Sequence, residues 1–168
     1  MGSVEGKWKM EDLKFKIGGI IQKRNLAKIG ILSIPDRPGV AGMIFSALGT
    51  KGISCPFIVH NIDLNDLDNI VLCVPRNCLP AALEVLEMIK KTVGAKEVIY
   101  DQEVGVVSVF GPHFGERAGV AGVMFSALAS VGINILAIST SISSLSCLIN
   151  ASEMDSAIQA LQGAFEQP

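Results

Sequence analysis

The first part of the chain alternates between a short apolar run and a segment with helical spacing. The run Ala27–Ile34 is rich in β-branched residues and predicts a strand. After the turn signal "PDRP", apolar residues recur every three or four positions, which predicts a helix that begins near Pro38 and is capped by Gly52. The residues on the apolar face of this helix are Val40, Ile44, Ala47 and Leu48.

Further strands and a second helix follow along the chain. The runs Ile53–Asn61 and Ile70–Pro75 predict two strands joined by an acidic loop, and Pro56 favours an edge position or a bulge for the first. Residues 79–91 predict an amphipathic helix, and residues 95–101 predict another strand. The order β-α-β-β-α-β is that of the ferredoxin-like fold, in which two helices cover one face of an antiparallel sheet. We therefore predict an α+β fold.

The same pattern returns eighty residues later. Between Arg37–Ile53 and Arg117–Ile133, eleven of seventeen positions are identical, which indicates an internal duplication. The second copy predicts a strand, a helix, two strands and a helix, but the chain then ends without a fourth strand. An unused β-rich piece, Phe15–Lys23, lies before the first copy. This piece can supply the missing strand, or it can pair with another molecule.

The first of these alternatives predicts how the domains are organised. Unit one would cover residues 24–101 and would be inserted into unit two, which would consist of residues 15–23 plus 102–168. Residues 1–14 would form an N-terminal tail. Each unit would then have the same ferredoxin-like topology, so that the chain carries two such units in tandem.

Composition narrows the classes of function. The chain of 168 residues is 49% hydrophobic, has a mean hydropathy of +0.47 and carries a net charge of −2. This charge gives no basic surface for nucleic acid. No apolar run reaches the ~18–20 residues of a membrane span, and the polar start is unlike a signal peptide, so we expect no membrane partner and a cytoplasmic location. The high apolar content favours burial in an oligomer interface.

Metal and cofactor chemistry are not expected. The four cysteines form no CxxC pair and the two histidines lie far apart, so metal ligands at the usual spacing are missing. The sequence also lacks the G-x-x-x-x-G-K-[ST] phosphate loop. The acidic residues Asp63, Asp66 and Asp68 do not fit a calcium loop and are interpreted as a solvated hairpin turn.

Two stretches carry a family resemblance that covers about Ile17 to Glu166. "DRPGVAGMIFSALGTKGIS" followed by "VHN", and "GVAGVMFSALASVGINILAISTS" followed by "LSCLI", resemble ACT domains, the small-ligand sensing modules of amino-acid metabolism. The doubled "GVA..FSAL" with "GINI.AISTS" is similar to the regulatory region of aspartate kinase. The resemblance implies allosteric control and the insertion of one ACT unit into the other. Because no kinase motif precedes this region, we expect no enzymatic activity, and an aspartate kinase catalytic domain or subunit becomes a possible partner.

The resemblance also implies a homodimer. In the family the effector lies between the first unit of one chain and the second unit of another. The sheet edges Ile53–Val59 and Ile133–Ser139 are then expected to pair or pack across the dimer. Asn134 is the residue that unit two would contribute to the effector.

The loop before the first predicted helix fits a free amino acid. Helix N-terminal amides suit the ligand carboxylate, and the side chain of Asp36 suits the ammonium. The predicted effector-binding residues are Asp36, Pro38, Gly39, Val40, Ala41, His60, Asn61 and Asn134. Simpler interpretations stay open at three of these positions. Asp36 can be an N-cap or turn residue, His60 a solvated strand end, and Asn134 a residue that bonds its own backbone.

Departures from the family pattern bear on the effector. His60 replaces a glutamine that is common in aspartate kinases, and a histidine can carry charge near pH 6–7. Ile142 replaces the glutamate of the family's "ISTSE", so threonine or another neutral amino acid is favoured over lysine. In unit two, Glu116 and Ala118 stand in place of the aspartate and proline of "PDRPG".

Two other classes of function compete with this interpretation. An enzymatic site could be drawn from Asp36, Cys55 and His60, but residues five apart in one strand face opposite sides. A free-standing ACT protein could instead act as an oligomerisation scaffold without ligand, or regulate an enzyme other than aspartate kinase. Binding of amino acids separates the scaffold from the sensor.

Overall fold

The computed structural model describes residues 15–112, 114 and 118–168. Within them the strands are β1 (Phe15–Lys16), β2 (Gly19–Pro35), β3 (Phe57–Ile62), β4 (Leu67–Pro75), β5 (Glu97–Phe110), β6 (Ala137–Thr140), β7 (Ser144–Asn150) and β8 (Phe165–Glu166). The α-helices are α1 (Val40–Thr50), α2 (Leu79–Val93), α3 (Val120–Ser130) and α4 (Met154–Ala164). Short 3-10 turns at Arg76–Cys78 and Ala151–Glu153 precede α2 and α4.

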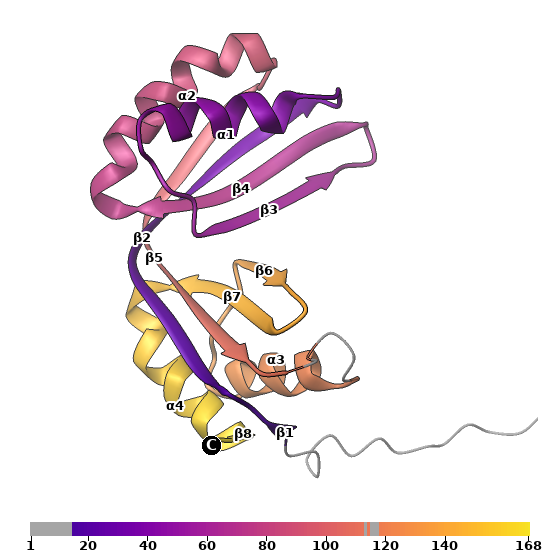
Figure 1. Cartoon of the computed structure of the whole chain (residues 1–168), viewed down its shortest axis with the longest axis vertical. Helices are drawn as coiled ribbons and strands as arrows, with labels where there is room; N and C mark the ends of the chain where they lie inside the picture. Colours follow the sequence, from indigo (N-terminus) through magenta and orange to yellow (C-terminus); the bar gives the residue numbers. More distant parts are fainter. Residues whose placement is uncertain (1–14, 113, 115–117) are drawn as a thin grey trace, which may run out of the picture.

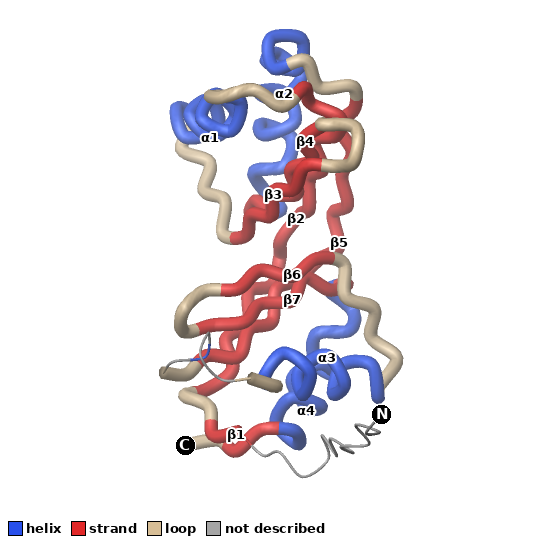
Figure 2. The backbone as a smooth tube through the Cα atoms, turned by 90° about the vertical axis from the view of Figure 1, so that its right-hand side faces the viewer, coloured by secondary structure: helices blue, strands red, loops and turns tan. Residues whose placement is uncertain are grey.

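Six of these strands form one antiparallel sheet in the order β3-β4-β2-β5-β7-β6. Figure 2 shows β2 and β5 running along the molecule through both halves. Unit one consists of α1, β3, β4, α2 and the adjoining parts of β2 and β5, and unit two of α3, β6, β7, α4 and the remaining parts. Each unit has an antiparallel sheet with two helices on one face, which confirms the predicted α+β fold.

The long central strands differ from the sequence-based expectation. The pattern predicted separate strands at Phe15–Lys23 and Ala27–Ile34, whereas β2 joins the second to the first from Gly19 onward, with register shifts between Lys23 and Lys28. Asn25 lies there with φ 57°, a left-handed conformation that asparagine tolerates better than most residues. Because a bulge of this kind bends a strand without ending it, the two units share one sheet.

The N-terminal strand completes the sheet of unit two. Residues Gly19–Lys23 pair antiparallel with Val106–Phe110 of β5. Ahead of them, β1 pairs in parallel with β8, a short strand after the last helix that the sequence pattern did not indicate. This pairing is the one that an inserted unit one requires. The boundaries at residues 24–101 remain a prediction.

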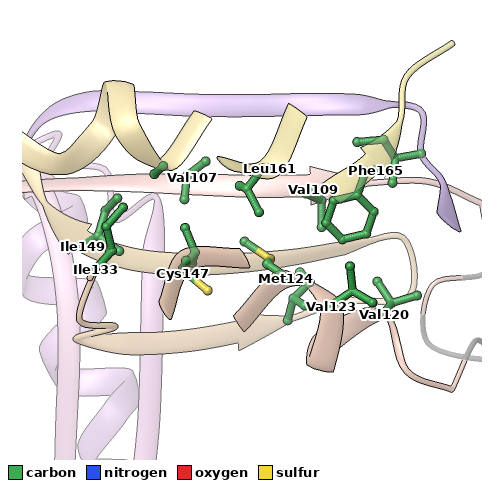
Figure 3. Close-up of a cluster of buried hydrophobic side chains, with 14 of the residues drawn as sticks. Val107, Val109, Val120, Val123, Met124, Ile133, Cys147, Ile149, Leu161 and Phe165 are labelled. Carbon is green, nitrogen blue, oxygen red and sulfur yellow. The ribbon is translucent and has the colours of Figure 1, made fainter. Parts of the chain in front are cut away.

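Each unit buries its helices against its own part of the sheet. In unit one, Ile29 and Ile31 of β2, together with Ile34 beyond an irregularity of the strand, pack in one core with Ile44 and Leu48 of α1. In unit two, the equivalent core contains Val107 and Val109 of β5, Met124 of α3 and Leu161 of α4 (Figure 3). The predicted apolar helix faces therefore point inward in both copies.

The sheet bends so that its two halves, one from each unit, turn their helix-free faces toward each other. In Figure 1 the helices of unit one lie at the top and those of unit two at the bottom, with the strands between them. A third core fills the space near the bend and contains Leu26, Phe57, Cys73, Val104 and Leu148. The outer strands β3 and β6 contact each other, and Phe57 of β3 belongs to this core. Both are edge strands of the sheet, as expected, but they begin at Phe57 and Ala137, later than the sequence pattern indicated.

In the described part of the chain, no helix is both long and apolar enough to cross a membrane.

Candidate functional site

The first helix begins after a left-handed glycine, and no side chain caps its N-terminal amides. α1 starts at Val40 and not near Pro38, because Gly39 has φ 96° and a left-handed conformation that ends the preceding turn. No side chain bonds the N-terminal amides of α1. Asp36 is therefore not an N-cap, whereas its interpretation as a turn residue stays open. The free N–H groups and the helix dipole are available to an anion.

An open cavity of about 390 Å³ lies at this helix start. This volume is within the range of small-ligand sites, which is ~300–1,000 Å³. Six of the eight predicted site residues line it, namely Asp36, Pro38, Gly39, Val40, Ala41 and His60. Arg37, Gly42 and Asp68 complete the lining. The cavity thus joins helix amides, two carboxylates and an imidazole.

Asp68 is the site residue that the sequence analysis missed. It was interpreted as part of a solvated turn, but it is 3% exposed and its Oδ1 has no hydrogen-bond partner. His60 Nε2 lies 3.2 Å from this oxygen, close enough for an ion pair but not aligned for a hydrogen bond. The signal was present in the alternation of β4, because Asp68 shares the helix-facing side with Ile70 and Leu72.

The rest of the acidic loop agrees with the predicted hairpin turn. Asp63 Oδ1 accepts hydrogen bonds from the N–H of Asn65 at 2.7 Å and of Leu67 at 3.1 Å, which is an Asx-type turn. Asp66 is exposed and adopts φ 55°. Across residues 15–112, 114 and 118–168, no group of three or more His, Cys, Asp or Glu side chains is placed to hold a metal ion.

The remaining two predicted site residues do not reach the cavity within this chain. Asn61 is exposed and pairs with Asn69, so it lies on the face of β3 opposite to His60. Asn69, the cross-strand neighbour of Asn61, bonds to β2, since its Oδ1 accepts a hydrogen bond from the N–H of Ser33 at 3.1 Å. Asn134 is exposed in the loop between α3 and β6.

Unit two has a second cavity at the start of α3, of about 280 Å³. Gly119 has φ 96° there, as Gly39 has in unit one. The described lining is neutral and consists of Phe114, Gly119, Val120, Ala121, Thr140, Ser141, Ser144 and Leu145. The hydroxyls of Ser141 and Ser144 bond each other at 2.8 Å. Glu116, the counterpart of Asp36, lies outside the described residues.

Cys55, Cys73 and Cys147 are not activated as nucleophiles. Burial raises the pKa of the Cys55 thiol, and it raises the pKa of both Cys73 and Cys147 to about 12. A nucleophilic cysteine requires the opposite shift, because the thiolate is the reactive form. The enzymatic alternative that used Cys55 therefore has no support in the electrostatics of the site.

Comparisons with known proteins agree with this architecture. A family model described as the ACT domain matches residues 107–165. The aspartate kinase of Pseudomonas fluorescens is 38% identical over 150 residues, which are 89% of this chain and 36% of that protein. The chain therefore spans about a third of the length of the curated relatives it matches.

Some solved structures match over nearly their whole length. The ligand-free regulatory subunit of aspartate kinase from Thermus thermophilus is 32% identical, with a TM-score of 0.82, and the match covers 89% of this chain and 99% of that one. A structure of aspartokinase alpha and beta subunits gives 34% identity, a TM-score of 0.80 and coverage of 88% and 97%.

The shared sheet, the paired helix-start cavities and these matches define the class of the molecule as a tandem pair of ACT domains. The chain belongs to the aspartate kinase family, in which it corresponds to the regulatory subunit or the regulatory C-terminal region. The resemblance stated from the sequence is thereby confirmed, as is the expectation that the match is to the regulatory part alone.

Proposed function

We propose that this chain is an allosteric sensor that binds a small amino acid at the start of α1 and controls an aspartate kinase catalytic domain or subunit. The observation that carries the proposal is the cavity in which uncapped helix amides face two carboxylates. An α-amino acid has one carboxylate and one ammonium about two bonds apart. A site with a positive helix end and acidic side chains complements both groups at once.

The chemistry assigns roles to the lining residues. The amides of Val40 and Ala41 receive the ligand carboxylate. Gly39 leaves the path to these amides open, because a Cβ at this position would project into the empty space of the cavity. Asp36 in the preceding loop is available for the ammonium. His60 provides a polar group on the opposite wall.

A neutral amino acid such as threonine is the preferred effector. Ile142 occupies the position of the family's glutamate, so this position offers no carboxylate for a second ammonium. Its side chain is 81% exposed. Lysine would bring that second charge without a partner at this position.

We propose a homodimer in which the edge strands meet. Exposed apolar residues lie on the helix-facing side of β3 (Ile58 and Ile62) and on β6 (Ile138). Pairing of these edges between chains would bury them and would bring Asn134 of one chain toward the α1 cavity of the other. The relative that contains alpha and beta subunits supports association with a catalytic subunit.

A thermal-shift screen of the twenty amino acids, followed by calorimetry, tests the proposal. We expect threonine or another neutral amino acid to raise the melting temperature, because a ligand that binds only the folded state stabilises it. Asp36→Ala should weaken this shift, whereas the control change Ser141→Ala in the cavity of unit two should preserve it. A chain that responds to none of the amino acids at millimolar concentration would be a scaffold and not a sensor.

A further inference from the structure

The carboxylate of Asp68 is buried, and one of its oxygens has no hydrogen-bond partner in the described chain. The residue is 3% exposed, its Oδ1 lacks a hydrogen-bond partner, and it lines the α1 cavity. Burying a charged oxygen without a partner costs free energy, so such groups are rare in folded proteins unless they serve a ligand. This observation is independent of the helix start on the other side of the cavity.

The groups that face Asp68 do not supply the missing partner. Arg37, on the loop after β2, directs its Nη2 to the carbonyl of Thr92 at the end of α2. Asp36, on the same loop, is another acid and is exposed. His60, on β3, is the one group in the described chain within ion-pair distance of Asp68, and its alignment leaves the oxygen without a hydrogen bond.

We propose that Asp68, and not Asp36, receives the ammonium of the bound amino acid, which displaces His60 from the carboxylate. This inference rests on the proposed function and names the residue that selects the ligand. A buried carboxylate attracts a cation more strongly than an exposed one, because water and salt screen the exposed charge. The exposed Asp36 contributes at the rim, and the buried Asp68 determines that the ligand must carry a free ammonium.

The assignment predicts a specific selectivity. L-Threonine should bind, whereas its 2-hydroxy analogue, 2,3-dihydroxybutanoate, should bind at least about 30-fold more weakly, since the loss of one partner of a buried charge pair strongly weakens binding. N-Acetyl-threonine, which also lacks the ammonium, should be rejected. Both analogues keep the carboxylate that the helix amides receive, so they separate the two halves of the site.

The experiment compares Asp68→Asn with the matched change Asp36→Asn by calorimetry on the full chain, with L-threonine and 2,3-dihydroxybutanoate as probes. For Asp68→Asn we expect affinity for threonine to fall at least about 30-fold, and preference over the analogue to disappear. For Asp36→Asn we expect less than about a fivefold loss. Unliganded Asp68→Asn should melt at or above the wild-type temperature, because a neutral amide is easier to bury than a carboxylate whose Oδ1 accepts no hydrogen bond.

The outcomes distinguish this assignment from the proposed function. If Asp36→Asn loses more affinity than Asp68→Asn, the sensor stands but the role of Asp68 is wrong. If Asp68→Asn fails to fold, Asp68→Ser is measured in its place, and wild-type binding of both probes with equal affinity would overturn the assignment without any variant. If the wild-type chain binds no amino acid at all, both the function and the assignment are overturned.

Discussion

The two units of this molecule begin their first helix in the same way but surround it with different chemistry. Gly39 and Gly119 both have φ 96°, and α1 and α3 follow them with matching sequences and lengths. The cavity of unit one then contains Asp36 and Asp68, whereas the described cavity of unit two is lined by hydroxyl and apolar groups. Duplication has kept the backbone feature, and the side chains around it determine whether a charged ligand can bind.

The difference originates in the strands opposite the helix. His60 and Thr140 occupy equivalent positions eighty residues apart, and each lines its own cavity. Near His60, the start of β4 places Asp68 at the cavity of unit one. Near Thr140, the turn between β6 and β7 places Ser141 and Ser144 at the cavity of unit two, where their hydroxyls bond each other. The two hydroxyls satisfy each other, whereas Oδ1 of Asp68 has only the poorly aligned imidazole of His60 beside it and would gain a partner from a cationic ligand.

The largest expected effect concerns the two fully buried thiols. Burial raises the pKa of both Cys73 and Cys147 to about 12, so at pH 8 we expect iodoacetamide to label each about 10³-fold more slowly than a free thiol. Cys73 lies in the smaller core between the units and should react before Cys147 as local opening exposes it. Mass spectrometry of labelled peptides measures both rates, and earlier labelling of Cys147 would contradict the proposed order.

The same thiols predict a pH dependence of stability. Their folded pKa lies above the value of about 8.5 in an unfolded chain, so the unfolded state releases protons first as pH rises. Stability should therefore be complete below pH 8.5 and decline above it. Urea unfolding at pH 7 and pH 10 tests this, with the double variant Cys73→Ala and Cys147→Ala as a control that should show a smaller decline.

Truncation of the matched helix leucines should cost somewhat less. Leu48 and Leu128 are both fully buried, and replacing either by alanine should lower the free energy of unfolding by ~2–5 kcal/mol. Since β2 and β5 belong to both units, we expect one cooperative transition in each variant, measured by circular dichroism in urea. Two separate transitions would show that the units unfold independently.

The paired glycines give a smaller effect that separates stability from binding. Gly39→Ala and Gly119→Ala should each cost ~1–2 kcal/mol, because alanine at φ 96° is strained although no atom obstructs its Cβ at Gly39. If the cavity of unit one is the effector site, calorimetry should detect weaker amino-acid binding in the Gly39 variant alone. Equal loss of binding in both would remove the distinction between the units.

The smallest effect concerns the ion pairs on either side of the bend. Arg24 pairs with Asp155 in unit two, and Arg76 pairs with Glu103 of β5, but the two acids are 80% and 70% exposed. Asp155→Asn and Glu103→Gln should each change stability by no more than ~0.2–1 kcal/mol. A melting-temperature loss as large as that of the leucine variants would show that these pairs hold the bend.

The sequence predicted the elements well where periodicity was strong and tertiary constraints were few. The amphipathic pattern at residues 79–91 corresponds to α2 at Leu79–Val93, and Gly52 with φ 68° lies at the predicted helix end. The helix start was misplaced, because proline is common in a first helical turn and the pattern could not show that Gly39 would adopt a left-handed conformation. Continuity of β2 through Asn25 was likewise missed, since a polar residue with turn propensity usually ends a strand.

The candidate site could be predicted only in part. The loop and helix start were identified from their residue types, and six of the eight residues do line one cavity. Asn61 was grouped with His60, although neighbouring residues of β3 lie on opposite faces of the sheet. The sequence gives no register for this strand, and a shift of one residue moves a side chain to the other face. Asp68 was missed because an acid near a hairpin is ordinarily solvated, and its burial depends on β4 beginning at Leu67.

The register of the central strands has a consequence for engineering. Leu26 lies opposite Val104 and Lys28 opposite Asp101, so the chain enters and leaves unit one through hydrogen-bonded neighbours. Lys23 lies opposite Val106, so a tight two-residue turn in place of residues 24–105 would join paired neighbours of unit two in a hairpin. The excision would also remove Leu26, Phe57, Cys73 and Val104 from the third core, so Val106 and Leu148 would lose their cover on that face.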